Sequence, residues 1–185
     1  DEHNCLEGGK YDYITKLAAK CNTKRLVPDY QSAKIMRRNY DGETFPPMGC
    51  RSHLSNWKDE NGNYKWYGRF NQGVVSLNLV QVALTANKDM DKFWEVLDER
   101  LSLCREALMV RHNLLLGTSS DISPIHWQHG GIARLEKGEK IDSLLKDGYS
   151  TLSLGYVGIY EMTQAMLGVS HTTKEGEEFA LQVMN

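Results

Sequence analysis

The sequence predicts an α/β fold with some parallel strand pairing, because strand-like and helix-like segments alternate along the chain. Residues 74–80 form an apolar, β-branched run that is typical of a buried strand. Residues 89–116 place apolar side chains three, four and seven positions apart, which is the spacing of one face of an α-helix. Residues 150–167 read as a strand, a glycine turn and a helix, an order that favours a strand leaving its sheet directly into a helix.

Composition and charge exclude several classes of protein. The 185 residues are 41% hydrophobic and 25% charged, which fits one globular domain. A formal net charge of -2 gives no electrostatic footprint for nucleic acid or an acidic membrane. No apolar run approaches the roughly 20 residues of a membrane helix. We therefore expect neither a nucleic-acid partner nor a membrane partner.

The cysteines indicate a reducing, cytoplasmic compartment. The four lie at positions 5, 21, 50 and 104, too far apart for a CxxC metal or redox motif. A core of this size can be stable without disulfides, so a disulfide scaffold is not expected. No signal peptide is visible, and residue 1 is Asp1 rather than methionine.

The first quarter of the chain predicts short helical pieces. Residues 13–21 have the apolar period of an amphipathic helix, which should end before Pro28. Residues 27–30 read as extended, and residues 31–38 fit either a helical turn or the end of a strand.

A shaped loop and a hairpin are predicted next. The loop covers residues 45–52, where two prolines forbid a helix and a glycine stands beside a cysteine. Residues 56–63 are rich in turn formers and include Asn61 and Gly62, a tight-turn signal. The returning strand of this hairpin should run over residues 64–70.

The helix over residues 89–116 has the clearest pattern in the chain. Acidic residues stand in its first turn and basic residues in its last, which suits the helix dipole. Gly117 is expected to close it in a left-handed conformation. Cys104 lies on the apolar stripe and is therefore interpreted as a core residue.

The last third of the chain continues the alternation. We expect an extended segment at 123–127, a short helix at 141–146, a strand at 150–154, and helices at 159–167 and 175–185. Both ends fall beside helical material, so a section of a larger protein is expected.

Cys50 is the strongest candidate for chemistry, because it stands between Gly49 and Arg51 in a proline-rich loop rather than on an apolar stripe. One interpretation is a buried loop thiol without chemistry. The other is a nucleophilic thiolate activated by His53 or Arg51.

Asn71 and a glycine pair are further candidates. Asn71 immediately precedes a buried strand, where it could line a site or simply form a turn. Gly155 and Gly158 flank a strand-to-helix junction, where free backbone N–H groups can bind phosphate, although a GxxG spacing also arises from close packing. His126 and His129 lack a convincing third ligand, so no metal is assigned.

Six motifs in register give the chain a family resemblance. It resembles the catalytic subunit of the class III anaerobic ribonucleotide reductases, glycyl radical enzymes that reduce ribonucleoside triphosphates. The motifs are KRLVPDY (24–30), MGCRS (48–52), GRFNQGVV (68–75), LDERL (97–101), SPIHWQHG (123–130) and STLSLGYVGIYE (150–161).

The resemblance implies a ten-stranded α/β barrel with Cys50 at the tip of a finger loop. Cys50 would become the thiyl radical that abstracts the ribose 3′ hydrogen, and Asn71 would hydrogen-bond ribose hydroxyls. Gly155, Tyr156 and Gly158 are expected near the substrate phosphates, which follows from the helix-terminus argument more than from a residue-level match. The resemblance also implies formate as the external reductant. His53 departs from the aromatic residue that the family commonly carries there.

The resemblance also implies that residues 1–185 are a central section of the barrel, incomplete at both ends and inactive alone. The glycyl radical motif, the structural zinc site, the effector region and the second active-site cysteine have no counterpart here. The parent enzyme would be a homodimer served by a radical-SAM activating enzyme.

Three alternatives remain at the level of sequence. A pyruvate formate-lyase-like acyltransferase would pair two adjacent cysteines, whereas Gly49 precedes Cys50 here. A noncatalytic nucleotide-binding module and a Cys-His hydrolase are the others.

Overall fold

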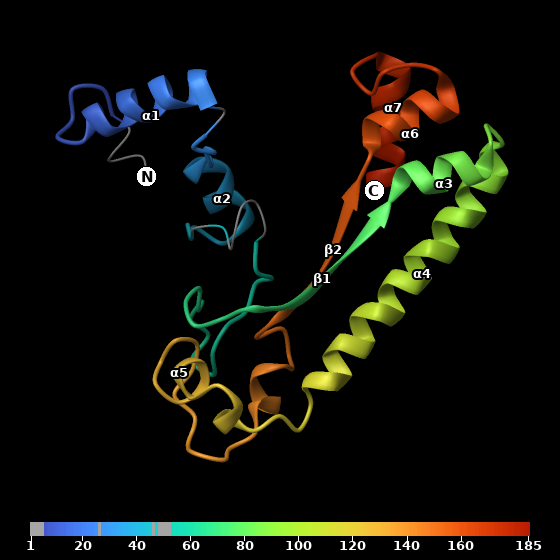
Figure 1. Ribbon diagram of the computed structural model, residues 1–185. Helices are drawn as coiled ribbons and strands as arrows, with labels where there is room; N and C mark the ends of the chain where they lie inside the picture. The colour runs from blue at the N-terminus through green and yellow to red at the C-terminus, as the bar shows by residue number, and fades with distance from the viewer. Residues whose placement is uncertain (1–5, 26, 46, 48–52) are drawn as a thin grey trace. The chain divides into compact units, whose positions relative to one another are not determined.

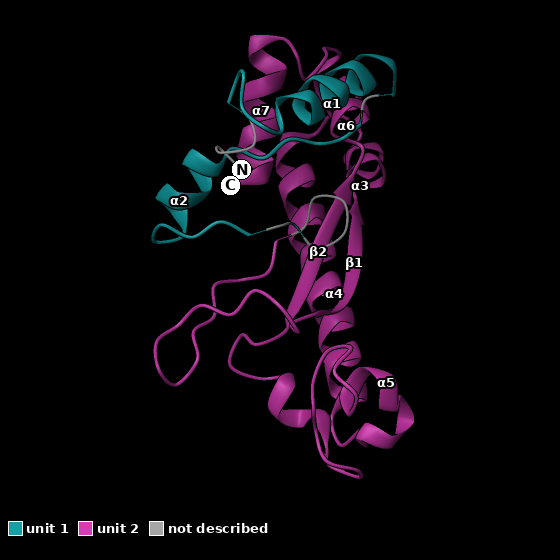
Figure 2. Cartoon of the chain, turned by 90° about the vertical axis from the view of Figure 1, so that its left-hand side faces the viewer, with its two compact units in different colours: residues 1–51 teal, residues 52–185 magenta. Residues whose placement is uncertain are grey.

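The computed structural model describes residues 6–25, 27–45, 47 and 53–185. Helices and strands follow one another as shown in Figure 1. The chain divides into two compact units, residues 1–51 and residues 52–185, which are coloured separately in Figure 2.

The first unit contains α1 (Asp12–Arg25) and α2 (Ala33–Asn39). The helix predicted at 13–21 is confirmed and extends by a further turn, although none of its residues is buried. Of the two alternatives at 31–38, a helical turn or the end of a strand, the structure shows the helix. The Ser32 hydroxyl accepts a hydrogen bond from the backbone N–H of Ile35 and caps α2.

The second unit is organised by two parallel strands, β1 (Asn71–Asn78) and β2 (Thr151–Val157). They lie side by side in Figure 1, with Val74 opposite Ser153 and Ser76 opposite Gly155. The expected α/β class with parallel pairing is thus confirmed. Within the described residues the sheet contains these two strands alone.

Four helices form one layer with the strands: α3 (Leu79–Ala86) and α4 (Met90–Leu115) contact the strands, α6 (Ile159–Leu167) packs on α3, and α7 (Lys174–Met184) packs on α6. Their shared core contains Leu77 from β1 and the fully buried Phe93 and Met162. Burying a side chain of this size stabilises the fold by about 1.5–3 kcal/mol. The core therefore fixes which face of the sheet turns toward the helices.

The long helix α4 agrees with its prediction. The Asp89 carboxylate accepts from the backbone N–H of Lys92 and caps the first turn. After the helix, Gly117 adopts a φ of +77°. Cys104 is buried in the core cluster, as its place on the apolar stripe predicts.

Helix α3 was missed by the sequence patterns, and the strand predicted at 74–80 is shifted. The strand β1 begins at Asn71 and ends at Asn78. The Asn78 side chain accepts from the Gln81 N–H and caps α3, which begins at the next residue. An apolar stretch this short does not distinguish a strand from a buried helical turn, so the cap decides the boundary.

The strand predicted at 64–70 is wrong. The turn itself forms, with Asp59 accepting from the backbone N–H groups of Asn61 and Asn63, but only the single bridge between Lys58 and Tyr64 follows it. The chain then bends away at Gly68, where φ is +65°.

The extended segment predicted at 123–127 is also wrong. Residues Pro124–Trp127 form the short helix α5, preceded by the 3-10 turn η1 (Ser120–Ile122). Proline at the first helical position has a suitable φ, and its missing N–H would have no partner within the helix anyway.

Two predictions near β2 need smaller corrections. The helix predicted at 141–146 is the 3-10 segment η2 (Ile141–Leu144). β2 continues to Val157, so Gly155 lies inside the strand rather than in a turn. The helices predicted at 159–167 and 175–185 are confirmed as α6 and α7.

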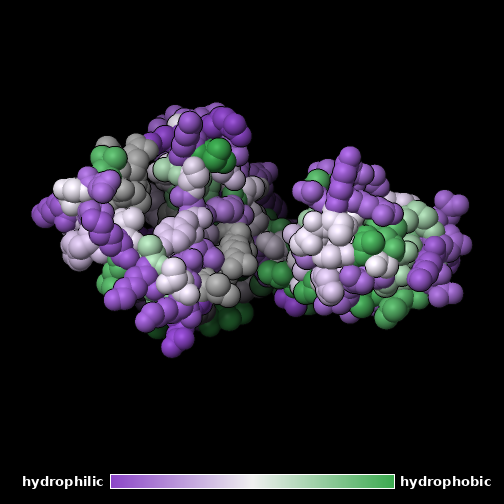
Figure 3. Space-filling view, turned by 90° about the horizontal axis from the view of Figure 1, so that it is seen from above, coloured by the Kyte–Doolittle hydropathy of each residue, from purple (hydrophilic) through white to green (hydrophobic). Residues whose placement is uncertain are grey.

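The surface mixes polar and apolar residues, and separate hydrophobic patches stand among hydrophilic ones in the view of Figure 3. None of the described helices combines the length and apolar composition needed to cross a bilayer.

Gly158 fixes the close approach of α6 to α3. Its φ of +90° is unfavourable for other residues, and a Cβ at this position would overlap the Val80 side chain at the start of α3. The close-packing interpretation of this glycine is therefore confirmed, and it brings the first turns of both helices together.

Gly158→Ala should lower the free energy of unfolding more than Gly168→Ala. Both glycines flank α6 with positive φ, so both substitutions incur about 1–2 kcal/mol of backbone cost. Gly168 has open space beside it, whereas the overlap with Val80 adds roughly 1–3 kcal/mol. Denaturant unfolding measures the difference. Equal losses in the two variants would contradict the packing role.

Candidate active site

Cys50 and its neighbour Arg51 lie outside the described residues. His53 is described and exposed. The candidate active site is therefore built from Asn71 and the groups around it.

Asn71 begins β1 and connects the two strands through its side chain. Its Nδ2 donates to Thr151 Oγ1 at 3.2 Å and to Ser153 Oγ, and its Oδ1 accepts from the Gly73 backbone N–H at 2.7 Å. Since a backbone N–H can only donate, the amide orientation is fixed: oxygen toward β1, nitrogen toward β2.

The two faces of the sheet differ in character. A Cβ at Gly73 would meet the Arg111 side chain on α4, whereas a Cβ at Gly155 would lie 2.9 Å from Ser76 Oγ. Alternation along each strand separates two sets of side chains, and the register shift between Asn71 and Gly73 puts Asn71 on the same face as its partner Thr151. One face carries Val75 and Leu77 toward the helical core. The other, which we term the open face, carries Asn71, Val74, Ser76, Thr151, Ser153 and Gly155.

Gln72 anchors the start of β1 to three other elements. Its Nε2 donates to the Leu145 carbonyl at 3.1 Å and to Ser150 Oγ at 2.8 Å. Its Oε1 lies 2.8 Å from His112 Nδ1 near the end of α4. Because the amide oxygen can only accept, His112 Nδ1 carries the proton in this contact. Gln72 thus joins α4, the residue after η2 and the residue before β2.

Arg69 is a buried cation coordinated by carbonyl oxygens. It is 7% exposed and donates to the carbonyls of Tyr149 and Gly148, each at 2.7 Å. Weaker contacts reach the Lys65 carbonyl and Ser55 Oγ. Burial lowers the pKa of the Arg69 guanidinium, yet it remains protonated because its ordinary pKa is far above neutrality. The contacts hold residues 148–149 directly before β2.

Tyr149 supports the same junction. Its hydroxyl donates to the Gly68 carbonyl at 2.8 Å and lies 3.0 Å from Lys65 Nζ, and its ring meets Trp57 edge to face. The segments that precede β1 and β2 are therefore joined by both polar and aromatic contacts.

The predicted phosphate-binding residues lie further along the sheet. Gly155 is on the open face, whereas alternation directs the Tyr156 side chain to the opposite face. Gly158 starts α6, which has no side-chain cap. Seven strand steps separate Thr151 from Gly158, roughly 23 Å at about 3.3 Å each. The structure therefore places Asn71 and Gly158 at opposite ends of the strands.

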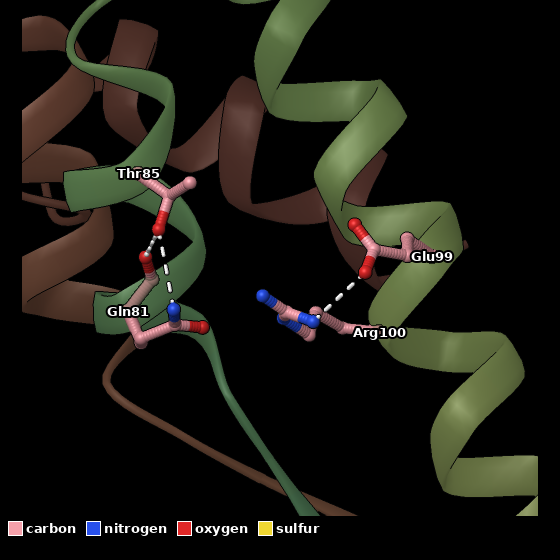
Figure 4. A network of polar contacts seen from close by, with 4 residues as sticks. All are labelled: Gln81, Thr85, Glu99 and Arg100. Atoms are coloured by element: carbon pink, nitrogen blue, oxygen red, sulfur yellow. Dashed lines mark hydrogen bonds and ion pairs between the residues drawn. The ribbon is translucent and has the colours of Figure 1, made fainter.

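A groove of about 250 Å³ lies on the other side, between β1 and α4. Two of its polar side chains bond within their own helices: Gln81 to Thr85, and Arg100 to Glu99, as Figure 4 shows. Cys104 and apolar side chains provide much of the remaining lining. This groove contains no arrangement of an acid, a base and a nucleophile.

One histidine of the pair contacts a neighbouring hydroxyl and the other lies on the surface. His126 Nδ1 lies 2.7 Å from Ser123 Oγ, and His129 is exposed. Across the part of the chain that the structure describes, no three His, Cys, Asp or Glu side chains gather as metal ligands would.

Sequence reasoning missed Arg69, Gln72, Thr151 and Ser153. The two hydroxyl residues had a signal, since polar side chains two apart on a strand share a face. Arg69 and Gln72 had none, because their partners lie about 40 to 80 positions away in sequence.

Arg69→Met should destabilise the chain strongly. The buried Tyr149 carbonyl loses its donor, at roughly 1–3 kcal/mol for the unsatisfied group, and the part-buried hydrogen bond to the Gly148 carbonyl is lost as well. The exposed Arg105 on α4 provides the matched control, and Arg105→Met should change the free energy of unfolding by less than about 0.5 kcal/mol. Similar denaturation midpoints for both variants would show that the Arg69 contacts are dispensable.

Comparison with known proteins gives one consistent result. A family described as anaerobic ribonucleoside-triphosphate reductase matches residues 1–185. Proteins with that same name from Salmonella typhimurium and Escherichia coli are each 42% identical over 168 residues, which is 87% of this chain and 22% of each relative. The one from Enterobacteria phage T4 is 45% identical over 159 residues, or 82% of this chain and 26% of the relative. The chain thus spans about a quarter or less of these relatives.

Proposed function

This chain belongs to the anaerobic ribonucleoside-triphosphate reductase family, and we propose that it is a central section of an enzyme reducing ribonucleoside triphosphates to deoxyribonucleoside triphosphates. The observation that carries the proposal is the family match along the whole chain, with Asn71 held on the open face of the sheet. The pyruvate formate-lyase-like alternative is not favoured by these comparisons.

In the proposed reaction, Cys50 and Asn71 act at the ribose. The Cys50 thiyl radical takes the hydrogen atom from C3′, which forms an S–H bond and leaves a carbon radical on the sugar. The neutral Asn71 amide belongs to the ribose-binding groups and does not titrate near neutral pH. Because hydrogen-atom transfer needs no thiolate, Cys50 requires a fixed position rather than an adjacent base.

The larger architecture in this proposal is a ten-stranded α/β barrel with Cys50 on a finger loop. A parallel pair with helices packed on one face supports this, since that is the layering of an α/β barrel wall. The open face would then line the barrel interior. Both outer edges of the described sheet lack a strand partner and would pair with strands from the rest of the enzyme.

The substrate phosphates are proposed to lie near Gly155, Tyr156 and Gly158. The uncapped first turn of α6 supports this, because its backbone N–H groups can donate to an anion. Tyr156 would contribute through its backbone, since its side chain faces away from Gly155.

The remaining parts of the proposal concern the parent enzyme. The glycyl radical that generates the Cys50 radical and the structural zinc belong to parts of the parent outside this chain. Formate supplies the reducing equivalents. The parent is a homodimer activated by a radical-SAM enzyme in the cytoplasm. The free thiols of Cys21 and Cys104 support a reducing compartment.

Cys50→Ala in the full-length enzyme should abolish ribonucleotide reduction and leave glycyl radical formation intact. Turnover is measured by deoxyribonucleotide product, and the radical by electron paramagnetic resonance. Cys21→Ala is the matched control, because this thiol is exposed on α1 and should be dispensable. Turnover retained by Cys50→Ala would reject the assignment.

The isolated chain should self-associate. Unpaired strand edges pair readily with a second copy, so the mass from light scattering should rise with concentration. A strict monomer at high concentration would count against open barrel edges.

A further inference from the structure

We propose that the hydroxyls of Ser153 and Thr151 donate the hydrogen bonds that hold a ribose hydroxyl, and that the amide nitrogen of Asn71 orients them. This inference rests on the proposed function and names substrate contacts within it.

The hydrogen-bond capacity of Asn71 leads to this assignment. A primary amide has two N–H donors, and the two acceptors of Asn71 Nδ2 are Thr151 Oγ1 and Ser153 Oγ. The opposite orientation of the amide is excluded, because Oδ1 accepts from the Gly73 N–H at 2.7 Å. A direct bond from the Asn71 amide nitrogen to a sugar would therefore require breaking one of these contacts.

The hydroxyls of Ser153 and Thr151 each keep a proton that the contact with Asn71 does not use. Each oxygen accepts from Asn71, and a hydroxyl has one proton of its own to donate. Neither proton reaches an acceptor in the part of the chain that the structure describes. Accepting a hydrogen bond polarises a hydroxyl and strengthens it as a donor. Ser153 and Thr151 are therefore prepared to donate to a third oxygen.

The surroundings of Ser153 and Thr151 indicate which chemical group carries that third oxygen. Around Thr151 and Ser153 neither strand carries an ionisable side chain, so this end of the open face is suited to a neutral hydroxyl, whereas the phosphates are proposed to lie toward Gly158 at the other end. The next position on β2 is Gly155, which has no side chain to block approach along the strand. Val74 on β1 is half exposed and provides an apolar surface beside it. A sugar hydroxyl matches this combination of neutral donors and a surface that no large side chain obstructs.

The test uses the full-length enzyme with Ser153→Ala and Thr151→Val, the second of which is nearly isosteric and keeps the test valid if the first folds poorly. We measure kcat and KM for a ribonucleoside triphosphate. We also measure competitive inhibition constants for its 2′-deoxy and 3′-deoxy analogues. Thr85→Val on α3 removes a hydroxyl remote from the open face and is the matched control.

Ser153→Ala should lower kcat/KM by about tenfold, the loss of roughly one hydrogen bond. The decisive readout is the wild-type preference for the ribonucleotide over one deoxy analogue, which should fall toward one. Ser153→Thr should restore it. Thr151→Val should reduce the same preference, and Thr85→Val should leave it unchanged.

Two results would overturn the assignment. Both variants could keep the wild-type preference, or both could lose affinity for ribonucleotide and analogues equally, which would indicate a structural role. Either result, together with inactive Cys50→Ala, would leave the reductase proposal standing. Turnover by Cys50→Ala would instead remove the reductase proposal itself.

Discussion

The parallel pairing of β1 with β2 is the constraint on which the second unit depends. Adjacent parallel strands cannot be joined by a tight turn, so the chain between them must cross over, and α3 and α4 provide much of that connection. The apolar faces of these helices bury Val75 and Leu77 on one side of the pair. The opposite side is thereby left for polar residues, and the open face follows from how the other face is packed.

Polar side chains fix the strand pair at its beginning. Arg69 binds the carbonyls directly before β2, and Gln72 connects the start of β1 to α4 and to Ser150. These groups are buried or half-buried, where an unsatisfied partner is costly. Their contacts bring Asn71 within reach of Thr151 and Ser153. The precision of the candidate site therefore comes from residues that would not touch a substrate.

The chemistry of the open face is neutral. Amide and hydroxyl groups are satisfied by one another on the protein side and retain donors on the other. Such a surface can orient a sugar without moving a proton. This is consistent with the proposed radical chemistry at Cys50, in which a hydrogen atom would be transferred and the geometry of the sugar would determine which one.

The sequence by itself determined the class of the fold, the long helix α4, the helices α6 and α7 and the family, because apolar periodicity is a local property and the order of motifs is read directly along the chain. It failed at residues 64–70 and 123–127, where turn chemistry at Gly68 and Pro124 outweighed the apparent extended pattern. It selected Asn71, but the orientation of that amide, the buried Arg69 and the two hydroxyls of β2 were decided only by tertiary structure. The reason is physical: each depends on partners that strand pairing brings together from about 80 residues away, and no local pattern encodes them.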